Sequence, residues 1–308
     1  MSFASRRAFL TGRRTAQTPW QAFCQRVQRS VAGDFLDYGF HDGEGSARLI
    51  PGDAADVHRA RAACAEFGVA LALEGLNQPA AHTRQSVLWL ELGRNFSQVQ
   101  RLQDDPGKWF VQAGCTLGEL AAAGLPQFAS LPGYTAVAAW LADRSYQAWK
   151  PGRTHLSGVV HARFMLADGS AASLGWFGES NRQPLDSLTL QRLIPSLFQL
   201  IGLPESRACL AAGNWPARYR LDALSPEAGH TVNLAHLLLG HGGDLAWLEW
   251  VVIDEAALAP AVDPDPAGFS LQRQAADTEL AAQAAELDSR VKALFDPQGL
   301  FSHPGQEL

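Results

Sequence analysis

The stretch SLPGYTAVAAWLADRSYQAWKPGRTHLSGVVHARFMLADG, residues 130–169, carries the most structural information in this chain. It ends in an apolar run from Val159 to Ala167, which is typical of a β-strand, and Asp168-Gly169 then gives a turn signal. It begins with Pro132-Gly133-Tyr134-Thr135, which leads into a run of small residues. The stretch therefore predicts a loop and a small-residue segment that lead to a strand.

The composition is that of a globular protein. The chain has 308 residues, of which 47% are hydrophobic and 18% charged, so it is long enough for one large domain or two smaller ones. The net charge of −6 argues against nucleic acid or an anionic membrane surface as the main partner. No stretch approaches the roughly 18 uninterrupted apolar residues of a membrane-spanning helix.

The N-terminus and the cysteines bear on where the protein is located. Ser5-Arg6-Arg7-Ala8-Phe9-Leu10 is similar to a twin-arginine export signal, but the residues that follow contain two more arginines and no apolar run. We therefore expect a basic lead-in rather than a working signal. The four cysteines form no C-x-x-C pair, which favours buried, reduced thiols in a cytoplasmic protein.

Hydrophobic spacing predicts a mixture of helices and strands in the first half. The expected helices are Pro19–Val31, Ala54–Phe67 and one through Leu117, Leu120 and Ala121, and the expected strands are Ala47–Ile50, Val69–Leu73, Val87–Leu92 and Trp109–Ala113. Residues 39–46 are expected to form a Gly-rich loop. Asp53 can cap the second helix and Gly68 can end it. This order of elements predicts an α+β fold, in which sheet and helices are segregated.

The second half repeats the mixture. Strands are expected at Val159–Ala167, Ala171–Leu174 and Leu245–Ile253, and helices at Leu188–Leu200, Leu234–Leu239 and Gln274–Leu294. The pattern divides the chain into four parts. They are a lead-in and helix at 1–46, a first α+β subdomain at 47–125, a second at 126–255, and a linker with a C-terminal helix at 256–308.

Several segments, taken in order, are similar to motifs of one flavoprotein family. They are Arg48–Pro51, Val111–Gly114, Gly152–Gly169, Arg218–Leu221, Leu237–Leu245 and Phe295–Pro304. Together with the segment after Pro132, this set resembles the PCMH-type FAD-binding proteins of the vanillyl-alcohol-oxidase family, in particular the FAD-binding subunit of glycolate oxidase and D-lactate dehydrogenase. The resemblance implies a PCMH-type fold of two α+β subdomains. Only Asp254–Gln274 separates the last matching strand from the final helix, so we expect the family's cap domain to be missing or vestigial.

The resemblance also implies FAD as the cofactor and assigns three groups of residues to it. The first group, at the phosphate loop, is Glu74, Gly75, Leu76, Asn77 and Gln78. The second group is Pro132, Gly133, Thr135, Ala136, Val137, Ala138 and Ala142, and the third is Gly152, Gly158, Val159 and Val160. No catalytic residue is assigned. His230, His236, His241 and Asp244 match no metal-ligand spacing, so no metal site is predicted.

This chain departs from the family at two of its glycine-dependent contacts. The family's phosphate loop is rich in glycine, whereas here only Gly75 remains, Glu74 adds a negative charge and Pro79 removes an N–H donor. The family's Gly-Gly pair after the threonine is replaced by Val137-Ala138. Glycine matters at such positions because only glycine lets the backbone approach a cofactor so closely.

Three functions remain open on the sequence alone. The first is an FAD-linked oxidoreductase subunit of the 2-hydroxy-acid (glycolate or D-lactate) dehydrogenase type, which acts with a partner flavoprotein or iron–sulfur subunit. The second is a non-catalytic accessory protein that keeps the fold but has lost FAD, with Val137, Trp140 and Leu76 filling the vacated cleft. A small-molecule binding module that reuses the cleft is the third.

Overall fold

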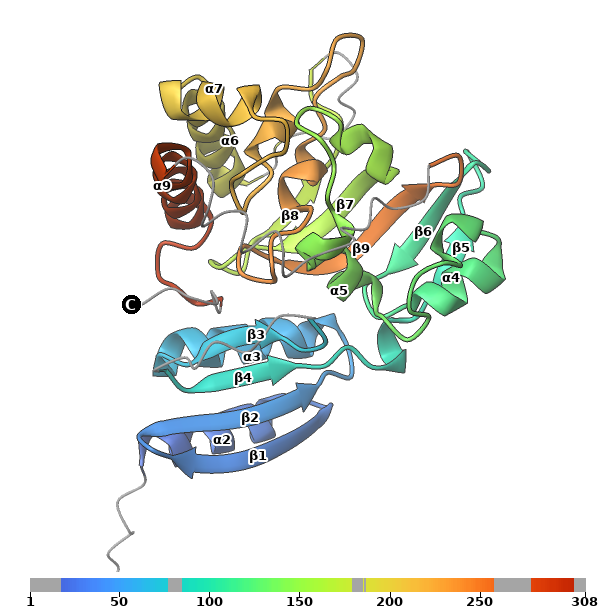
Figure 1. Cartoon of the computed structure of the whole chain (residues 1–308). Coiled ribbons are helices and arrows are strands. Elements are labelled where there is room, and N and C mark those ends of the chain that lie inside the picture. Colours follow the sequence, from blue (N-terminus) through green and yellow to red (C-terminus); the bar gives the residue numbers. More distant parts are fainter. Residues whose placement is uncertain (1–17, 77–84, 179–184, 186, 258–277, 302–308) are drawn as a thin grey trace, which may run out of the picture.

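The computed structural model describes residues 18–76, 85–178, 185, 187–257 and 278–301. Within them the chain forms two β-sheets, each with its own helices (Figure 1). The first sheet, with β1 to β4, lies below the second in this view, and α9 and the other late helices lie beside the second sheet. The mixed α+β fold with two subdomains that the sequence predicted is therefore confirmed.

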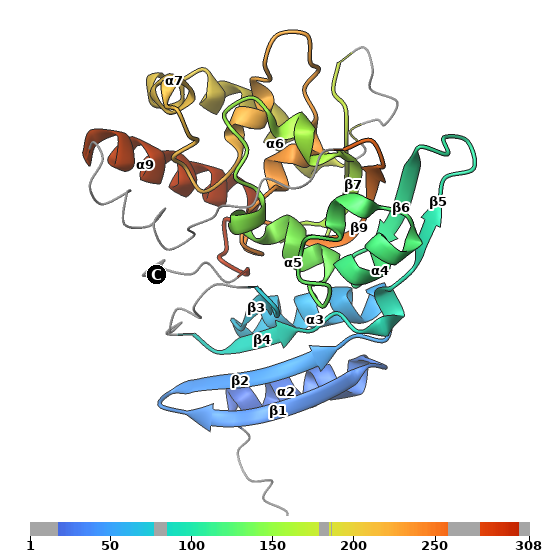
Figure 2. The same ribbon diagram turned by 45° about the vertical axis from the view of Figure 1, so that its right-hand side comes forward.

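The first sheet contains four strands in the order β1-β2-β4-β3. Their bounds are Asp34–His41 for β1, Glu44–Ile50 for β2, Ala70–Leu73 for β3 and Val87–Leu90 for β4. Strand β1 pairs antiparallel with β2, whereas β2 and β3 each pair parallel with β4. Helices α2 (Pro19–Ser30) and α3 (Ala54–Phe67) pack beside one another on this sheet, as the turned view also shows (Figure 2).

The two helices begin and end where their sequences provide caps. Thr18 accepts a hydrogen bond from the Gln21 N–H, and the Gln21 side chain accepts one from the Thr18 N–H, which completes a capping box at the start of α2. The Asp53 side chain caps α3 by accepting from the Asp56 N–H, and Gly68 ends this helix with φ of +66°. Both helices were predicted from the sequence and are confirmed.

The stretch at residues 39–46 is a β-hairpin, so the prediction of a Gly-rich loop is wrong. Asp42 and Gly43 form the turn between β1 and β2, with φ of +53° and +94°. Positive φ at both central residues is the property of the tight turns that join antiparallel strands, and Asp-Gly favours it. The two residues were therefore the signal for a hairpin.

The second sheet contains five antiparallel strands in the order β5-β6-β9-β7-β8. Their bounds are Val99–Arg101 for β5, Lys108–Gln112 for β6, Val159–Met165 for β7, Ala171–Leu174 for β8 and Trp247–Asp254 for β9. The sheets thus divide between Leu90 and Val99, whereas the sequence pattern placed the division after Leu125. Strand β6, expected in the first subdomain, belongs to the second sheet because it pairs with β9.

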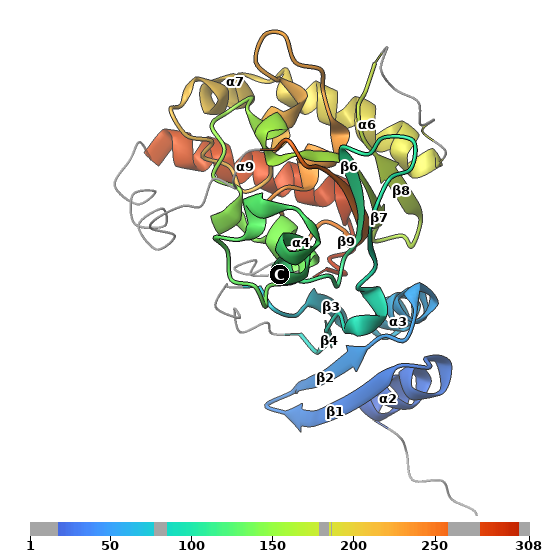
Figure 3. The same cartoon turned by 90° about the vertical axis from the view of Figure 1, so that its right-hand side faces the viewer.

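Helices cover one face of the second sheet (Figure 3). They are α4 (Leu117–Ala123), α5 (Val137–Ala142), α6 (Leu188–Ile201), α7 (Pro204–Ala211) and α9 (Thr278–Phe295). The segment expected as a helix at 234–239 is a 3-10 helix over Leu234–Leu238, and α7 was not predicted. No helix among the described residues has the length and apolar character to cross a bilayer.

Two large hydrophobic cores hold the described part of the chain together, and a small third cluster lies around Ala70, Ala72 and Val87. One lies between the second sheet and its helices. The other lies under α2 and α3 and includes Met165 and Trp247 from the second sheet, together with Leu300 and Phe301 near the end of the chain. Because the second core draws on both sheets, the two halves pack against each other. All four cysteines are buried, as the sequence predicted.

Candidate functional site: the crevice between the two sheets

The two sheets meet along a narrow crevice. Its walls include Leu73 at the end of β3, Ala138 of α5, and His241, Gly243 and Trp247, which lead into β9. Ala138 belongs to the second group of residues that the resemblance assigns to FAD, and Leu73 directly precedes the first group. The fold therefore brings the segments after β3 and around α5 to the same place.

The crevice has almost no free space. Its cavity measures about 10 Å³, which is room for about one water molecule. Sites for small molecules usually enclose roughly 300–1,000 Å³. The described residues of the crevice therefore do not fit a flavin.

Side chains from both sheets close the crevice. A Cβ added at Gly243, where φ is +77°, would lie 3.2 Å from Cβ of Leu73 and 3.3 Å from Cδ1 of Leu76. Phe301 pairs as a bridge with Leu71 of β3 and lines the same space. The backbone at Gly243 thus lies against leucine side chains.

The backbone amides at the start of α5 are already bonded. The N–H of Val137 donates to the carbonyl of Cys115 at 2.8 Å, and the N–H of Ala138 donates to the carbonyl of Ala113 at 2.9 Å. Free N–H groups of this kind are what a backbone cradle offers to a pyrophosphate. Here they hold the loop before α5 against the loop before α4, so they are not available to an anion.

Helix α5 is buried on all sides. The side chains of Val137 and Trp140 are 0% and 1% exposed, and Trp140 packs edge-on against Phe128 with ring centroids 5.1 Å apart. These contacts belong to the core of the second sheet. The crevice is lined instead by residues such as Leu73, Trp247 and Phe301, so Val137 and Trp140 do not fill it in the way that the sequence suggested.

The other residues of the second group lie in the loop before α5. Gly133 is exposed, and Pro132, Thr135 and Ala136 are half-buried. Ala142, at the end of α5, is buried and its carbonyl accepts a hydrogen bond from the N–H of Gly242 at 2.7 Å.

The phosphate-loop segment is unfavourable for an anion. Glu74 and Gly75 are exposed, and Leu76 is half-buried. Partial burial and the nearby Glu91 carboxylate raise the pKa of Glu74, while Arg48 acts in the opposite direction. Because Arg48 is paired with Glu91 at 2.8 Å, its charge is not free to offset a phosphate. Asn77 and Gln78 lie outside the described residues.

The third group lies away from the crevice. Val159 begins β7 opposite Ile253, whereas the crevice residue Trp247 pairs with Met165, six residues further along β7 and about 20 Å away. The carbonyl of Val159 accepts a hydrogen bond from the Asn233 side chain and contacts Nε2 of His236 at 2.7 Å. Val160 is half-buried on the same strand.

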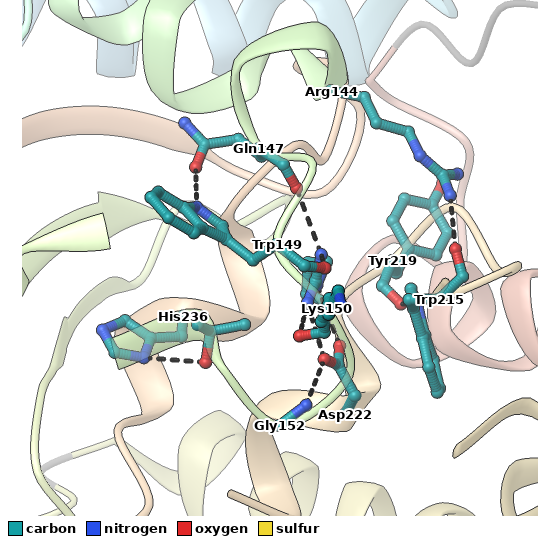
Figure 4. A network of polar contacts seen from close by, with 11 residues as sticks. Arg144, Gln147, Trp149, Lys150, Gly152, Trp215, Tyr219, Asp222 and His236 are labelled. Atoms are coloured by element: carbon teal, nitrogen blue, oxygen red, sulfur yellow. Dashed lines mark hydrogen bonds and ion pairs between the residues drawn. The ribbon is translucent and has the colours of Figure 1, made fainter. Parts of the chain in front are cut away.

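The two glycines of the third group serve structural contacts. The N–H of Gly152 donates to Asp222 at 3.0 Å, as Figure 4 shows, and φ is +74° at this residue. Gly158 has the same positive φ and its carbonyl accepts from the N–H of Asp254. The assignment of this group to a cofactor stays a prediction.

A buried ion pair lies beside the crevice. Arg218 and Asp244 approach to 2.7 Å, and burial raises the pKa of Asp244 to about 6 against the opposing effects of Arg218 and Lys292. A Cβ at Gly242 would lie 2.1 Å from Nη2 of Arg218, so only glycine leaves room for the guanidinium. Burial, with Arg218 and Lys292, lowers the pKa of His241 to about 3, which keeps this ring neutral at pH 7. Sequence reasoning missed this pair because its two members carry no local motif.

No protein-family model matches the chain. No curated protein matches it either. Similar solved structures include a 4-ethylphenol oxidase from Gulosibacter chungangensis, with 14% identity and a TM-score of 0.43 over 77% of this chain and 42% of that chain. A glucooligosaccharide oxidase from Acremonium strictum has 15% identity and a TM-score of 0.40 over 74% and 42% of the two chains.

An alkyldihydroxyacetonephosphate synthase is a third similar structure, with 12% identity and a TM-score of 0.38 over 68% of this chain and 32% of that chain. The chain spans less than half of the length of each of these structures. They are PCMH-type FAD-binding proteins, the family that the sequence motifs resemble.

Proposed function

We propose that this chain is a non-catalytic accessory protein that keeps a flavoprotein-type fold without binding FAD. The observation that carries the proposal is the packed crevice, where leucine, tryptophan and phenylalanine side chains leave a cavity of about 10 Å³. The bonded amides of Val137 and Ala138 support it, since a pyrophosphate would have to break backbone hydrogen bonds that join two loops. Oxidation of a 2-hydroxy acid needs a site that orients substrate against a cofactor, and the packed crevice has room for neither.

The partner that we propose is a flavoprotein or iron–sulfur subunit of the glycolate or D-lactate dehydrogenase type. An accessory protein needs a surface for such a subunit, and β1 offers one. This strand is at the edge of the first sheet, and its side chains Leu36, Tyr38 and Phe40 are 48%, 47% and 54% exposed. Exposed apolar side chains on an unpaired edge favour association with another protein.

The competing function is an FAD-linked oxidoreductase subunit of the same dehydrogenase type. One observation favours it: Ala138 and the segment after Leu73, which the resemblance assigns to FAD, lie at the same crevice. In that function the crevice would have to open, and Leu76 would have to leave Gly243. The two functions therefore differ in whether the isolated chain takes up FAD.

We expect the purified chain to bind no FAD. A titration that follows the fluorescence of free FAD should show no change, and the protein should have no absorbance near 450 nm after desalting. Because a flavin can be lost in purification, the control is the same chain unfolded in urea and refolded with excess FAD. Colour that stays with the refolded protein, or reduction of a dye by this chain alone with glycolate or D-lactate, contradicts the proposal.

If β1 forms the partner surface, substitutions of its exposed side chains should weaken binding of the partner. Replacing Leu36 and Phe40 together by serine should weaken binding to the co-expressed flavoprotein and iron–sulfur subunits by at least about tenfold, because a few side chains that become buried at the centre of an interface carry most of its energy. The matched control is Tyr134→Ser, which removes an 87% exposed aromatic side chain from the loop before α5. Partner affinities are measured by biolayer interferometry. Equal affinities of the two variants would show that the partner binds a surface other than β1.

A further inference from the structure

Three metal-ligating side chains meet far from the crevice. His155 lies in the 3-10 helix Thr154–Ser157, and Glu227 and His230 lie in the loop that follows the 3-10 helix Leu221–Leu224. One potential ligand atom from each lies within 4.8 Å of the other two. The group sits near the beginning of β7, at the end of the strand opposite to the crevice.

The distances suit a single small cation. Oε1 of Glu227 lies 3.4 Å from Nε2 of His155 and 4.0 Å from Nε2 of His230. Zinc binds histidine nitrogen and carboxylate oxygen at about 2.0–2.2 Å in a tetrahedron, which sets its ligand atoms roughly 3.4 Å apart. The spacing of these atoms is therefore close to that of zinc ligands, and what remains to be adjusted is the orientation of the two rings.

The charges around the group leave the ligand atoms available. The imidazole rings of His155 and His230 stack with centroids 3.6 Å apart and planes at 16°. Two stacked imidazolium cations would repel each other, so the stacked arrangement favours neutral rings, whose nitrogen lone pairs can bind a metal. Arg153 occupies the other carboxylate oxygen of Glu227 at 2.9 Å, which orients Oε1 toward the rings.

We propose that His155, Glu227 and His230 form a binding site for a divalent transition metal of the zinc class. Two imidazoles and a carboxylate are ligands that favour zinc over calcium or magnesium. The rings must turn from their stacked arrangement so that their Nε2 lone pairs converge, and the side chains, 22% and 43% exposed, have room to do so. Water completes the coordination. The bound cation joins two loops that are distant in the sequence, and the site is independent of the proposed accessory function.

A second histidine–glutamate pair provides a matched control. Nε2 of His58 lies 3.6 Å from Oε1 of Glu249, and the His58 side chain is 39% exposed. Among the residues that the structure describes, no third metal-ligating side chain joins this pair. A pair of this kind holds zinc poorly because stable sites use at least three protein ligands. The comparison between the two sites thus isolates the effect of the third ligand.

The test is a calorimetric titration of the full chain, prepared without a histidine tag and stripped with a chelator, with zinc chloride. We expect one zinc ion per chain. His230→Ala and Glu227→Gln should each weaken binding at least about tenfold, since even the loss of an outer partner of a ligand costs that much. His58→Ala should leave the affinity unchanged. No stoichiometric binding by the unaltered chain, or unchanged binding by His230→Ala, overturns the proposal.

A second measurement, of melting temperature with and without zinc, distinguishes the loss of the metal site from poor folding of a variant. Zinc should raise the melting temperature of the unaltered chain and of His58→Ala, because a ligand that binds only the folded state stabilises it. It should not raise the melting temperature of Glu227→Gln. Without zinc the three proteins should melt at similar temperatures, since each variant alters an ion pair whose members are partly exposed, and such pairs contribute little to stability. An equal rise in all three also overturns the proposal.

Discussion

Replacing Arg220 by alanine is expected to lower the free energy of unfolding by about 3–5 kcal/mol, the range for breaking one partner of a buried ion pair. Arg220 and Asp222 are 4% and 0% exposed, and the guanidinium contacts both carboxylate oxygens, at 2.9 and 2.6 Å. Without the arginine, the Asp222 carboxylate stays buried with no cation beside it.

The Arg220→Ala variant also loses hydrogen bonds outside the ion pair with Asp222. Nη1 of Arg220 donates to the carbonyls of Gln147 and Trp149 at 3.1 and 2.8 Å, so the variant also leaves these carbonyl oxygens without this donor. The second carboxylate oxygen of Asp222 accepts from the N–H of Gly152, which ties the same loop from the other side (Figure 4). Arg220 is thus the centre of the contacts that shape residues 147–152.

Urea unfolding followed by circular dichroism measures the effect. The control is Arg26→Ala, which breaks an exposed ion pair with Glu66 at 3.7 Å and should cost less than about 1 kcal/mol. A loss at Arg220 no larger than that at Arg26 would show that the buried network contributes little.

Replacing Asp56 by asparagine is expected to lower the free energy of unfolding by about 3 kcal/mol, because an amide nitrogen would face buried N–H donors. The fully buried Asp56 carboxylate accepts hydrogen bonds from the N–H groups of Ala32, Gly33 and Gly52, at 2.8–2.9 Å. It therefore joins the end of α2, the start of β1 and the loop before α3.

The stabilisation by Asp56 should depend on pH. Burial raises the pKa of this carboxyl, but the hydrogen bonds from the backbone and the contact with Arg59 outweigh burial, so the pKa is lowered in the folded state. The stabilisation is therefore fully present above the unfolded pKa of about 3.9 and is lost as the pH falls through the lower folded value.

The difference in unfolding free energy between the unaltered chain and Asp56→Asn should accordingly shrink below about pH 4. Asp104→Asn, which alters an exposed aspartate, is the control and should show no such difference. A difference that stays constant as the pH falls well below about 3.9 would contradict the role of the ionised carboxylate.

Elements with local signals were predictable from the sequence. Helix α3 was placed correctly because Asp53 caps it and Gly68 ends it, and both signals lie next to the apolar face. Strand β1 was missed although Leu36, Tyr38 and Phe40 alternate with polar residues and glycine, because the glycines of residues 39–46 were interpreted as a loop. The sheet to which β6 belongs depends on β9, which follows it by more than a hundred residues.

The resemblance implied that the segments around the end of β3 and around α5 lie close together, and Leu73 and Ala138 do line one crevice. The assignment of these segments to a cofactor stays a prediction, and the packing of the crevice was not predictable. The side chains that close it include Trp247 and Phe301, whose approach depends on tertiary packing alone. His155 and His230 likewise lie far apart in the sequence, and rules of ligand spacing recognise only ligands that are close along the chain.

The position of β9 has a consequence for how the chain folds. The first sheet uses strands that follow one another closely in the sequence, so it can form early during synthesis. The second sheet cannot close until Trp247–Asp254 enters between β6 and β7. Until then the pairs β5–β6 and β7–β8 each have an open edge, which can pair with other chains. We therefore expect the nascent chain to aggregate most readily before β9 has left the ribosome.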